Sequence, residues 1–203
     1  MPIDVLSTGY ALKQTARLNR ELWRLPDRRF ESSLSISSEA ATIWASPARS
    51  SERLQLSIVA RWFPQMVGED YAIQQQIRTG KIFGGVPFDE LFMLGLERDN
   101  DLWMRAHVGT LGGRKGNAPL GRHYYLDNWE IDKNLYSAGF FSVKLSPFLD
   151  IGWMDSSMGL GTGKWCWDTG VQVKFRVLGA GIVFIYGKDL RSGHNAFYVA
   201  DSR

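Results

Sequence analysis

The sequence predicts an all-β protein whose strands form an antiparallel meander. Apolar and polar side chains alternate at period two in several segments, most regularly over residues 171–177, where Val171, Val173 and Phe175 share one face. Period two is the pattern of a strand, because successive side chains point to opposite faces of a sheet. Clusters of glycine, proline and serine separate these segments and indicate turns. Alternation is typical of soluble and membrane sheets alike, so it indicates strands without indicating a location.

The first half of the chain is expected to contain four strands. Residues 10–23 have a spacing of leucines that suits either a strand or an amphipathic helix; we assign a strand, followed by a turn at Pro26 and Asp27. The next three strands are predicted at residues 29–45, 52–63 and 70–83. A serine-rich turn and a turn that contains Pro64 join them, so consecutive strands are expected to be neighbours in the sheet.

Residues 84–121 have a different character, since glycine and proline interrupt the segment throughout. The segment is too long for a hairpin connection, and long irregular segments in compact folds are usually functional. Strands then resume at residues 122–133, 138–152, 167–178, 180–190 and 195–200, with turns at 134–139, around 159–163, at Gly179 and at 191–194. No internal repeat or low-complexity linker divides the chain, which is treated as one domain over residues 1–203 with about eight or nine strands.

Composition excludes several classes of function. A hydrophobic fraction of 44% and a charged fraction of 22% indicate a folded chain rather than a disordered one. The net charge of +3 is small and its basic residues are dispersed among acids, so no nucleic-acid partner is predicted. The single cysteine, Cys166, cannot form an internal disulfide, and the three histidines have no metal-ligand spacing in sequence. We therefore predict no cofactor and no metal site.

Two observations bear on membranes. No run approaches the roughly 18 apolar residues of a spanning helix, so any membrane residence must use strands. Many of the aromatic residues lie near predicted strand ends, which is typical of the aromatic girdles of membrane barrels, although an aromatic core of a soluble protein gives a similar count. The first thirty residues lack the apolar core of a signal peptide. The chain is therefore expected either to stay inside the cell or to be the C-terminal part of an exported protein.

Candidate chemical motifs are few. The glycine-rich run that ends at Lys164 lacks the glycine and the hydroxyl residue of a phosphate-binding loop, and neither His123 nor His194 accompanies a nucleophile signature. The alternation places Glu130 and Asp150 on the polar faces of two neighbouring strands. Such a pair can serve as the acid and base of a glycosidase, or can be two solvated surface charges. The residues alone leave both readings open.

Four motifs, in order, resemble the C-terminal barrel half of the bacterial surface antigen family, which contains the BamA, TamA and FhaC types of outer-membrane assembly and secretion barrels. They are the run from Val86 to Gly95 (VPFDELFMLG), the run from Leu102 to His107 (LWMRAH), Asn128-Trp129-Glu130, and the run from Pro147 to Gly152 (PFLDIG). The family pattern is a Pro-x-x-x-x-Phe-x-Leu-Gly-Gly segment, a loop with Arg-Gly-Phe/Tyr, a strand with an inward Glu, and Phe-x-Asp-x-Gly. The resemblance covers roughly residues 70–200.

The resemblance implies half of a transmembrane β-barrel, with the segment 84–121 folded into the lumen and Arg105 paired with Glu130 and Asp150. Ala106 and His107 would be the loop neighbours of the arginine, and Phe148 and Gly152 the strand neighbours of the aspartate. The chain departs from the family at Ala106, where the family has glycine, and at Leu96, where it has the second glycine of the first motif.

The implied function is that of a non-enzymatic outer-membrane protein. The parent would insert outer-membrane proteins or translocate polypeptides, and its partners would be outer-membrane lipid, unfolded client polypeptides, and an N-terminal barrel half with periplasmic domains that this chain lacks. Family barrels have about sixteen strands, so the chain is expected to be a fragment whose targeting depends on sequence elsewhere. The alternatives are a β-barrel hydrolase that uses Glu130 and Asp150 as acid and base, and a soluble β-sandwich binding module.

Overall fold

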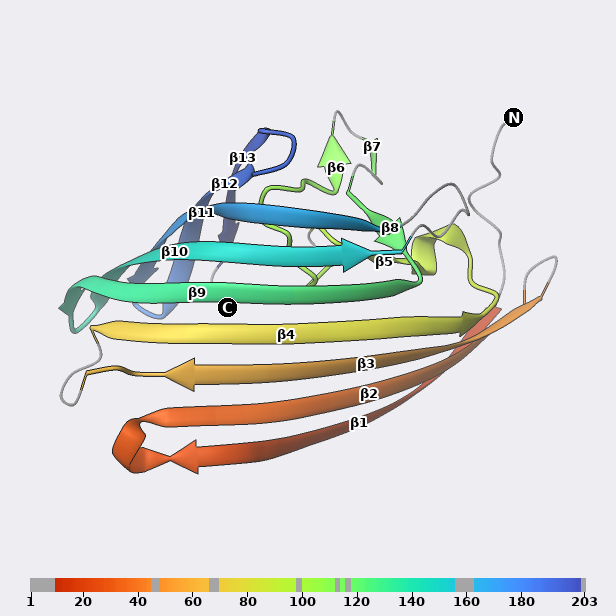
Figure 1. The fold of residues 1–203 in the computed structure, drawn as a ribbon, viewed down its shortest axis with the longest axis horizontal. Helices are drawn as coiled ribbons and strands as arrows, with labels where there is room; N and C mark the ends of the chain where they lie inside the picture. Colours follow the sequence, from red (N-terminus) through yellow and green to blue (C-terminus); the bar gives the residue numbers. More distant parts are fainter. Residues whose placement is uncertain are drawn as a thin grey trace.

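The computed structural model describes residues 10–44, 48–65, 70–97, 100–111, 114–115, 118–155 and 163–201. Within these ranges the chain forms one nine-stranded antiparallel sheet, in which consecutive long strands of the chain are neighbours (Figure 1). The strands are β1 (Tyr10–Leu25), β2 (Phe30–Trp44), β3 (Arg49–Trp62), β4 (Tyr71–Gly84), β9 (His123–Ala138), β10 (Phe141–Met154), β11 (Lys164–Val177), β12 (Ala180–Asp189) and β13 (Asn195–Asp201). The predicted all-β antiparallel meander is confirmed.

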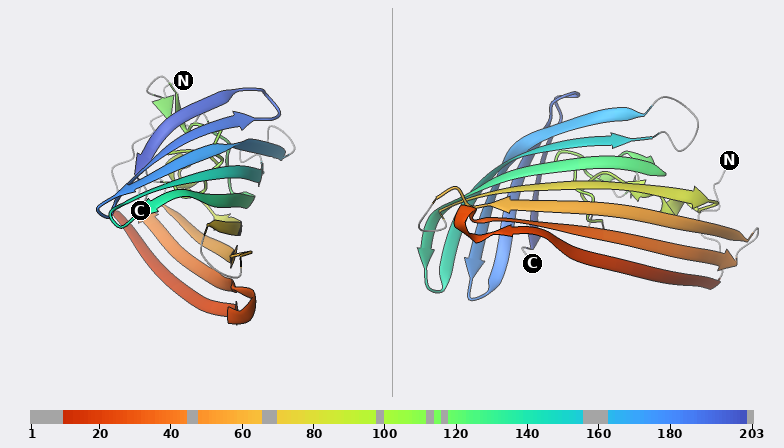
Figure 2. Two further views of the ribbon diagram at one scale, coloured as in Figure 1. Left: turned by 90° about the vertical axis from the view of Figure 1, so that its left-hand side faces the viewer. Right: turned by 60° about the horizontal axis from the view of Figure 1, so that its bottom comes forward.

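The sheet is open, and β1 and β13 are its two edge strands. It is strongly curved, like a trough, and the long connection between β4 and β9 lies on its concave side (Figure 2). We call this connection, residues 85–122, the inward loop. Its described parts contain the 3-10 turn η2 (Phe88–Glu90) and four two-residue strands, β5 (Phe92–Met93), β6 (Thr110–Leu111), β7 (Arg114–Lys115) and β8 (Leu120–Gly121). β5 pairs with β8, and β6 pairs with β7.

The connections differ between the two ends of the sheet. At one end, tight turns join β1 to β2 through η1 (Pro26–Arg28), β9 to β10 and β11 to β12, while the connection from β3 to β4 is longer, residues 63–70. Positive φ angles at Arg29, Gly139, Leu178 and Gly179 allow the chain to reverse within a few residues. The inward loop starts and finishes at the opposite end of the sheet, as do the connections that follow β2, β10 and β12. We call these the short-turn end and the long-loop end.

The structure differs from the predicted boundaries mainly in β9. This strand continues to Ala138, so the predicted strand 122–133 is too short and the predicted turn at 134–139 is wrong. Residues 134–138 have turn-like composition, yet they pair with β10, and a bulge beside Val143 accommodates one extra residue. β11 also begins at Lys164, three residues before the prediction. Most of the turn predicted around 159–163 lies outside the described residues.

β1 settles the ambiguity of residues 10–23. It pairs with β2 along its whole length, with one irregularity between Glu21 and Trp23. A strand at the edge of a sheet receives its hydrogen bonds from a single neighbour, and the regular alternation of β2 provides that neighbour. The helical reading is therefore wrong, for a reason that lies outside the segment itself.

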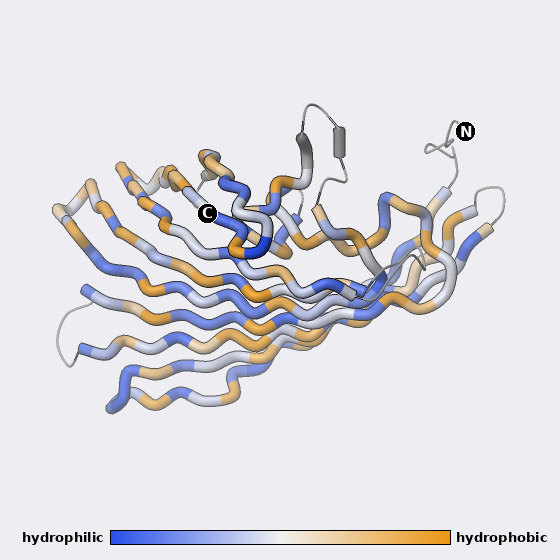
Figure 3. The backbone as a smooth tube through the Cα atoms, turned by 45° about the horizontal axis from the view of Figure 1, so that its top comes forward, coloured by the Kyte–Doolittle hydropathy of each residue, from blue (hydrophilic) through white to orange (hydrophobic). Residues whose placement is uncertain are grey.

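The two faces of the sheet differ in polarity, because residues paired directly across neighbouring strands share a face. One row on the convex face runs through Leu145, Val173, Phe184 and Val199. A row on the concave face runs through Glu31, Arg61, Gln74 and Glu130. Figure 3 shows the resulting alternation of hydrophilic and hydrophobic residues along the strands. Large apolar side chains on the convex face remain exposed, including Phe184 at 39% and Val199 at 54%.

The main apolar cluster lies between the inward loop and the concave face. Its buried members are Ile82, Phe92, Leu94, Leu102, Met104, Tyr124, Leu126, Met154 and Cys166. Leu94 and Met104, both from the loop, are completely inaccessible to solvent. Burial of these side chains stabilises the loop against the sheet by about 1.5–3 kcal/mol for each fully buried large side chain. Within the described ranges, no helix has the length and apolarity needed to cross a membrane.

Candidate functional site

The middle of the inward loop, residues 100–109, is folded tightly against itself. Asn100 donates from Nδ2 to the backbone oxygens of Met93 (2.9 Å) and Gly95 (2.6 Å). The backbone nitrogen of Leu96 donates to the oxygen of His107 (2.7 Å), and the nitrogen of His107 donates to the oxygen of Met104 (3.0 Å). The last bond closes a turn that presents Arg105 to the concave face.

Arg105 contacts both of the carboxylates that were predicted as its partners. Its Nε lies 2.9 Å from Asp150 Oδ2 and its Nη2 lies 2.6 Å from Asp150 Oδ1, a bidentate contact. Its Nη1 donates to Glu130 Oε2 at 2.6 Å. Phe148 supplies an aromatic face, with its ring centroid 3.9 Å from the guanidinium carbon. Arg105 is 4% exposed and Asp150 is fully buried, so this contact is shielded from water.

Glu130 is shared between Arg105 and two residues of β11. Gln172 donates from Nε2 to Glu130 Oε2 at 2.5 Å, and the Lys174 ammonium pairs with Oε1. Lys174 also lies 2.9 Å from Asp132, which accepts a hydrogen bond from Ser146. Glu130 is therefore held by two cations and an amide rather than by Arg105 alone.

Asn128 and Arg78 extend the contact to the loop backbone. Asn128 donates from Nδ2 to Asp150 Oδ1 (2.7 Å) and to the backbone oxygen of Trp103 (2.9 Å), while its Oδ1 accepts from Arg78 Nη2 (2.8 Å). Arg78 also donates to the backbone oxygen of Asp101. Side chains of β4, β9 and β10 thus fasten residues 101–105 at several points. Arg78 was not singled out by the sequence analysis.

Burial and charge act in opposite directions on Arg105. Burial disfavours the charged guanidinium, but the charges and hydrogen bonds of Asp150 and Glu130 outweigh it and raise the pKa of Arg105. The arginine is therefore a permanent cation. It lies 2.6 Å from an oxygen of each carboxylate.

The next two loop residues contact a second pair of aspartates. The backbone nitrogen of Ala106 donates to Asp168 Oδ2 at 2.7 Å, and His107 Nδ1 lies 3.0 Å from the same oxygen. His107 Nε2 lies 3.8 Å from Asp189 Oδ2. Burial opposes the charged imidazole, but hydrogen bonds to Asp168 and Cys166 and the charges of these groups outweigh it, raising the pKa of His107 to about 10. Asp168 and Asp189 were not among the predicted site residues.

A signal for these aspartates does exist in the sequence. Asn128, Asp150, Asp168 and Asp189 are paired directly across β9, β10, β11 and β12, so they form one row on the concave face. The same alternation that assigned Gln172 and Lys174 to the polar face of β11 also assigns Asp168 to it. The register between strands, which aligns the four residues in one row, is not visible in any single strand.

Two glycines give the loop room to approach the sheet. A Cβ at Gly187 in β12 would collide with the backbone carbonyl group of Arg105. A Cβ at Gly152, one of the predicted motif residues, would lie 2.7 Å from the Met104 sulfur. Met104 is a flexible side chain and can shift, whereas the carbonyl opposite Gly187 belongs to the loop backbone. Glycine is therefore required more strictly at position 187 than at position 152.

Ala106 and Leu96, the two departures from the family pattern, fit without strain. Among the described non-glycine residues, positive φ angles occur at Arg29 and Leu178 only, so Ala106 has an ordinary backbone conformation. Ala106 is 8% exposed and Leu96 is 8% exposed. Both side chains are accommodated in the loop core, and neither position requires glycine here.

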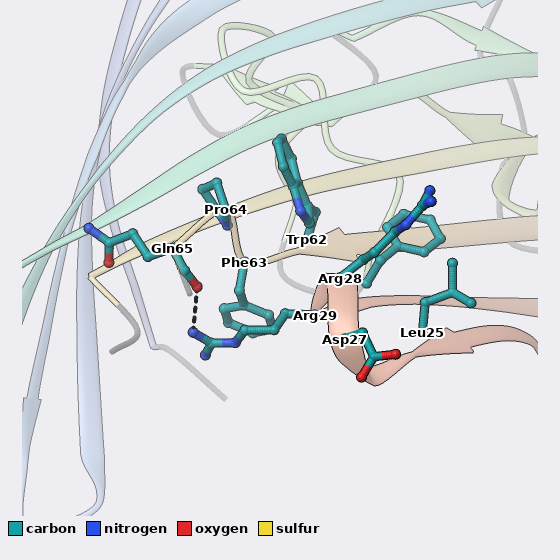
Figure 4. A pocket seen from close by; sticks show the side chains of 9 residues that line it. Leu25, Asp27, Arg28, Arg29, Trp62, Phe63, Pro64 and Gln65 are labelled. Atoms are coloured by element: carbon teal, nitrogen blue, oxygen red, sulfur yellow. Dashed lines mark hydrogen bonds between the residues drawn. The ribbon is translucent and has the colours of Figure 1, made fainter. Parts of the chain in front are cut away.

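A surface hollow lies at the short-turn end of the sheet, away from Arg105. It has a volume of about 560 Å³ and is lined by Leu25, Asp27, Arg28, Arg29, Phe30, Trp62, Phe63, Pro64 and Gln65 (Figure 4). Arg29 crosses it to donate to the backbone oxygen of Gln65 at 2.8 Å. None of its lining residues belongs to the Arg105 site. The charged groups on the concave face therefore do not line this hollow.

Comparisons with known proteins add no identification. The chain matches no known protein family, no curated protein and no solved structure.

Proposed function

We propose that this chain is a segment of an outer-membrane β-barrel of the surface antigen type, whose parent inserts outer-membrane proteins or translocates polypeptides. The observation that carries the proposal is the contact of Arg105, from a loop on the concave face, with Glu130 and Asp150. The contact lies inside a trough whose opposite face exposes many large apolar side chains. This combination suits a lumen that holds a folded-in loop and an outer wall that meets lipid.

The convex face supports contact with lipid. Large aromatic side chains stand exposed on it near both ends of the strands. They are Trp44, Phe83 and Trp165 near the long-loop end, and Trp23, Trp62 and Tyr136 near the short-turn end. Apolar residues such as Ile36 and Phe184 lie between them. Aromatic girdles around an apolar band are the surface of an outer-membrane barrel, and a soluble protein rarely exposes this many large apolar side chains on one face.

The connections support an orientation. Outer-membrane barrels have short turns on the periplasmic side and longer loops outside. The short-turn end would therefore face the periplasm, and the inward loop would enter the lumen from the outer side. Aspartates and basic residues on the concave face would then line a water-accessible interior rather than a lipid surface.

The number of strands supports membership of a larger barrel. β1 and β13 run in the same direction, because they are the first and ninth strands of an antiparallel sheet. They cannot pair with each other in antiparallel fashion, so closure requires an odd number of further strands. A barrel of about sixteen strands satisfies this condition and leaves a lumen wide enough for the inward loop. Closure also removes the two open edges, whose unpaired backbone groups cost several kcal/mol each in lipid.

The geometry argues against the hydrolase alternative. A glycosidase needs one carboxylic acid that holds a proton at the start of the reaction. Arg105 pairs with both Glu130 and Asp150, and Lys174 pairs with Glu130 again. Asp150 is completely buried and Glu130 is held by two cations, so neither carboxylate is presented to a substrate. A structural role for the three residues needs no proton transfer.

Quenching of tryptophan fluorescence tests the membrane assignment. The chain is refolded with phospholipid vesicles in which a fraction of the acyl chains is brominated. Because most tryptophans stand on the convex face, we expect strong quenching that depends on bromine depth. A chain that stays monomeric in buffer without vesicles, with fluorescence unaffected by brominated lipid, would overturn the proposal. Insertion of a client barrel by the reconstituted parent is the subsequent test of activity.

A further inference from the structure

A cluster of three possible metal ligands lies beside the Arg105 contact. His107 comes from the inward loop, Asp168 from β11 and Asp189 from β12. One donor atom from each of them can be chosen so that all three lie within 4.8 Å of one another. The side chains are mostly shielded, with exposures of 17% for His107, 0% for Asp168 and 11% for Asp189. The three residues are far apart in sequence, so the loop completes the cluster only when it lies on the concave face.

The two aspartates of the cluster differ in how their oxygens are partnered. Among the described residues, His107 is the sole side chain that forms an ion pair with Asp168 or Asp189. Arg105 is already engaged by Asp150 and Glu130. Asp189 in addition accepts hydrogen bonds from the backbone nitrogen of Arg191 (2.8 Å) and from Ser192 Oγ (2.5 Å), so both of its oxygens have partners.

Asp168, in contrast, has an atom without a partner. The residue is completely buried, and its Oδ2 accepts from Ala106 and contacts His107. Its Oδ1 is buried and has no hydrogen-bond partner among the described residues. Buried polar atoms are almost always satisfied, so an unpartnered carboxylate oxygen indicates a missing ion or water. This observation is independent of the spacing of the three donors.

We propose that His107, Asp168 and Asp189 bind a divalent cation of the zinc type, which fastens the inward loop to β11 and β12. One imidazole nitrogen with carboxylate oxygens suits a first-row transition metal better than calcium or magnesium, which prefer oxygen ligands alone. The cation would also supply a partner for the buried Oδ1 of Asp168. The Arg105 contact fastens the loop to β9 and β10, so the two sites together would hold it against four consecutive strands.

Zinc binding by the full chain, folded in detergent micelles and stripped of metal with a chelator, tests this proposal. Isothermal titration with zinc chloride and metal analysis after dialysis should both give one tightly bound ion. His107→Asn and Asp189→Asn should each weaken binding by at least about tenfold. The matched control is His123→Asn, a histidine of β9 outside the cluster, which should bind zinc like the unchanged chain. Circular dichroism of each variant reports whether the sheet has formed.

A second measurement separates a metal site from a simple ion pair. Zinc should protect the inward loop of the unchanged chain against a protease, and it should give no added protection to His107→Asn. Equal zinc affinity in the unchanged chain and in folded His107→Asn would overturn the proposal, as would the lack of stoichiometric binding by the unchanged chain. Because the readouts are metal content and loop protection, the result is independent of whether the parent inserts or secretes polypeptides.

Discussion

Asp150 accepts hydrogen bonds from both the guanidinium and the backbone nitrogen of Arg105. Nε and Nη2 approach its two oxygens at 2.9 and 2.6 Å, and the backbone nitrogen lies 3.0 Å from Oδ2. A single buried carboxylate therefore fixes the position of the side chain and the path of the loop backbone at the same residue. Contacts of this kind constrain a loop more than a side-chain ion pair alone, because the peptide cannot swing while the guanidinium stays in place.

Replacement of Arg105 by alanine should detach the loop. The variant leaves Asp150 buried without its cation, and the loss of one partner of a buried pair costs roughly 3–5 kcal/mol. The rate of proteolysis within the inward loop of the folded chain measures this effect. Arg61→Ala is a matched control on the same face, since Arg61 and its partner Glu31 are each 45% exposed, and an exposed pair contributes about 0–1 kcal/mol. Equal protease resistance of the two variants would contradict the prediction.

A double substitution should cost less than the sum of its parts. Asp150→Asn removes the carboxylate that Arg105→Ala leaves unpaired, so the second change relieves part of the penalty of the first. We expect a coupling free energy of about 0.5–3 kcal/mol between the two positions in denaturant unfolding. If the losses in unfolding free energy of the two single variants added up to that of the double variant, Arg105 and Asp150 would not act as one unit.

Arg105→Lys should be only slightly more stable than Arg105→Ala. Lysine keeps the positive charge, but its ammonium cannot fork onto two carboxylates or stack on the Phe148 ring as a planar guanidinium does. The variant should therefore resemble Arg105→Ala in protease sensitivity more than the unchanged chain. If lysine gave full protection, charge alone would account for the contact.

Gly187→Ala should push the loop away from β12. The added methyl group would collide with the backbone carbonyl of Arg105, which cannot shift without disturbing the bonds to Asp150. Proteolysis of the loop should accelerate while the β-sheet signal in circular dichroism persists. Gly85→Ala is the control, because its methyl group would meet only side-chain atoms of Arg49 at 3.8 Å. Similar behaviour of the two variants would count against a close approach at Gly187.

A charge on the convex face should impair membrane insertion far more than a charge on the concave face. Phe184→Lys places an ammonium on the apolar band, where lysine near the bilayer midplane costs about 2–4 kcal/mol. Ser33→Lys adds the same charge to an exposed residue of the concave face. The yield of folded chain in vesicles measures the difference. An equal loss in both variants would argue that lipid does not cover the convex face.

Much of the candidate site was accessible from the sequence, because the period of a strand is a local property. Alternation within β9 and β10 placed Glu130 and Asp150 on the polar face, and the run of glycines marked the long connection that supplies Arg105. The same local pattern contained Asp168 and Asp189, yet nothing within either strand showed that they meet the loop. Register between strands and the path of a loop are long-range properties, so they are absent from the pattern of any one segment.

The sequence by itself determined that the chain is β, where most strands lie and which face of each strand is polar, since these depend on side chains two residues apart. Only the tertiary structure decided that residues 10–23 form a strand and that β9 continues to Ala138. It also decided that the loop accommodates alanine, rather than glycine, at position 106, and that Asp168 and Asp189 join His107. The physical reason is the same in each case: a neighbouring strand or loop supplies the hydrogen bond, the space or the charge that the segment alone lacks.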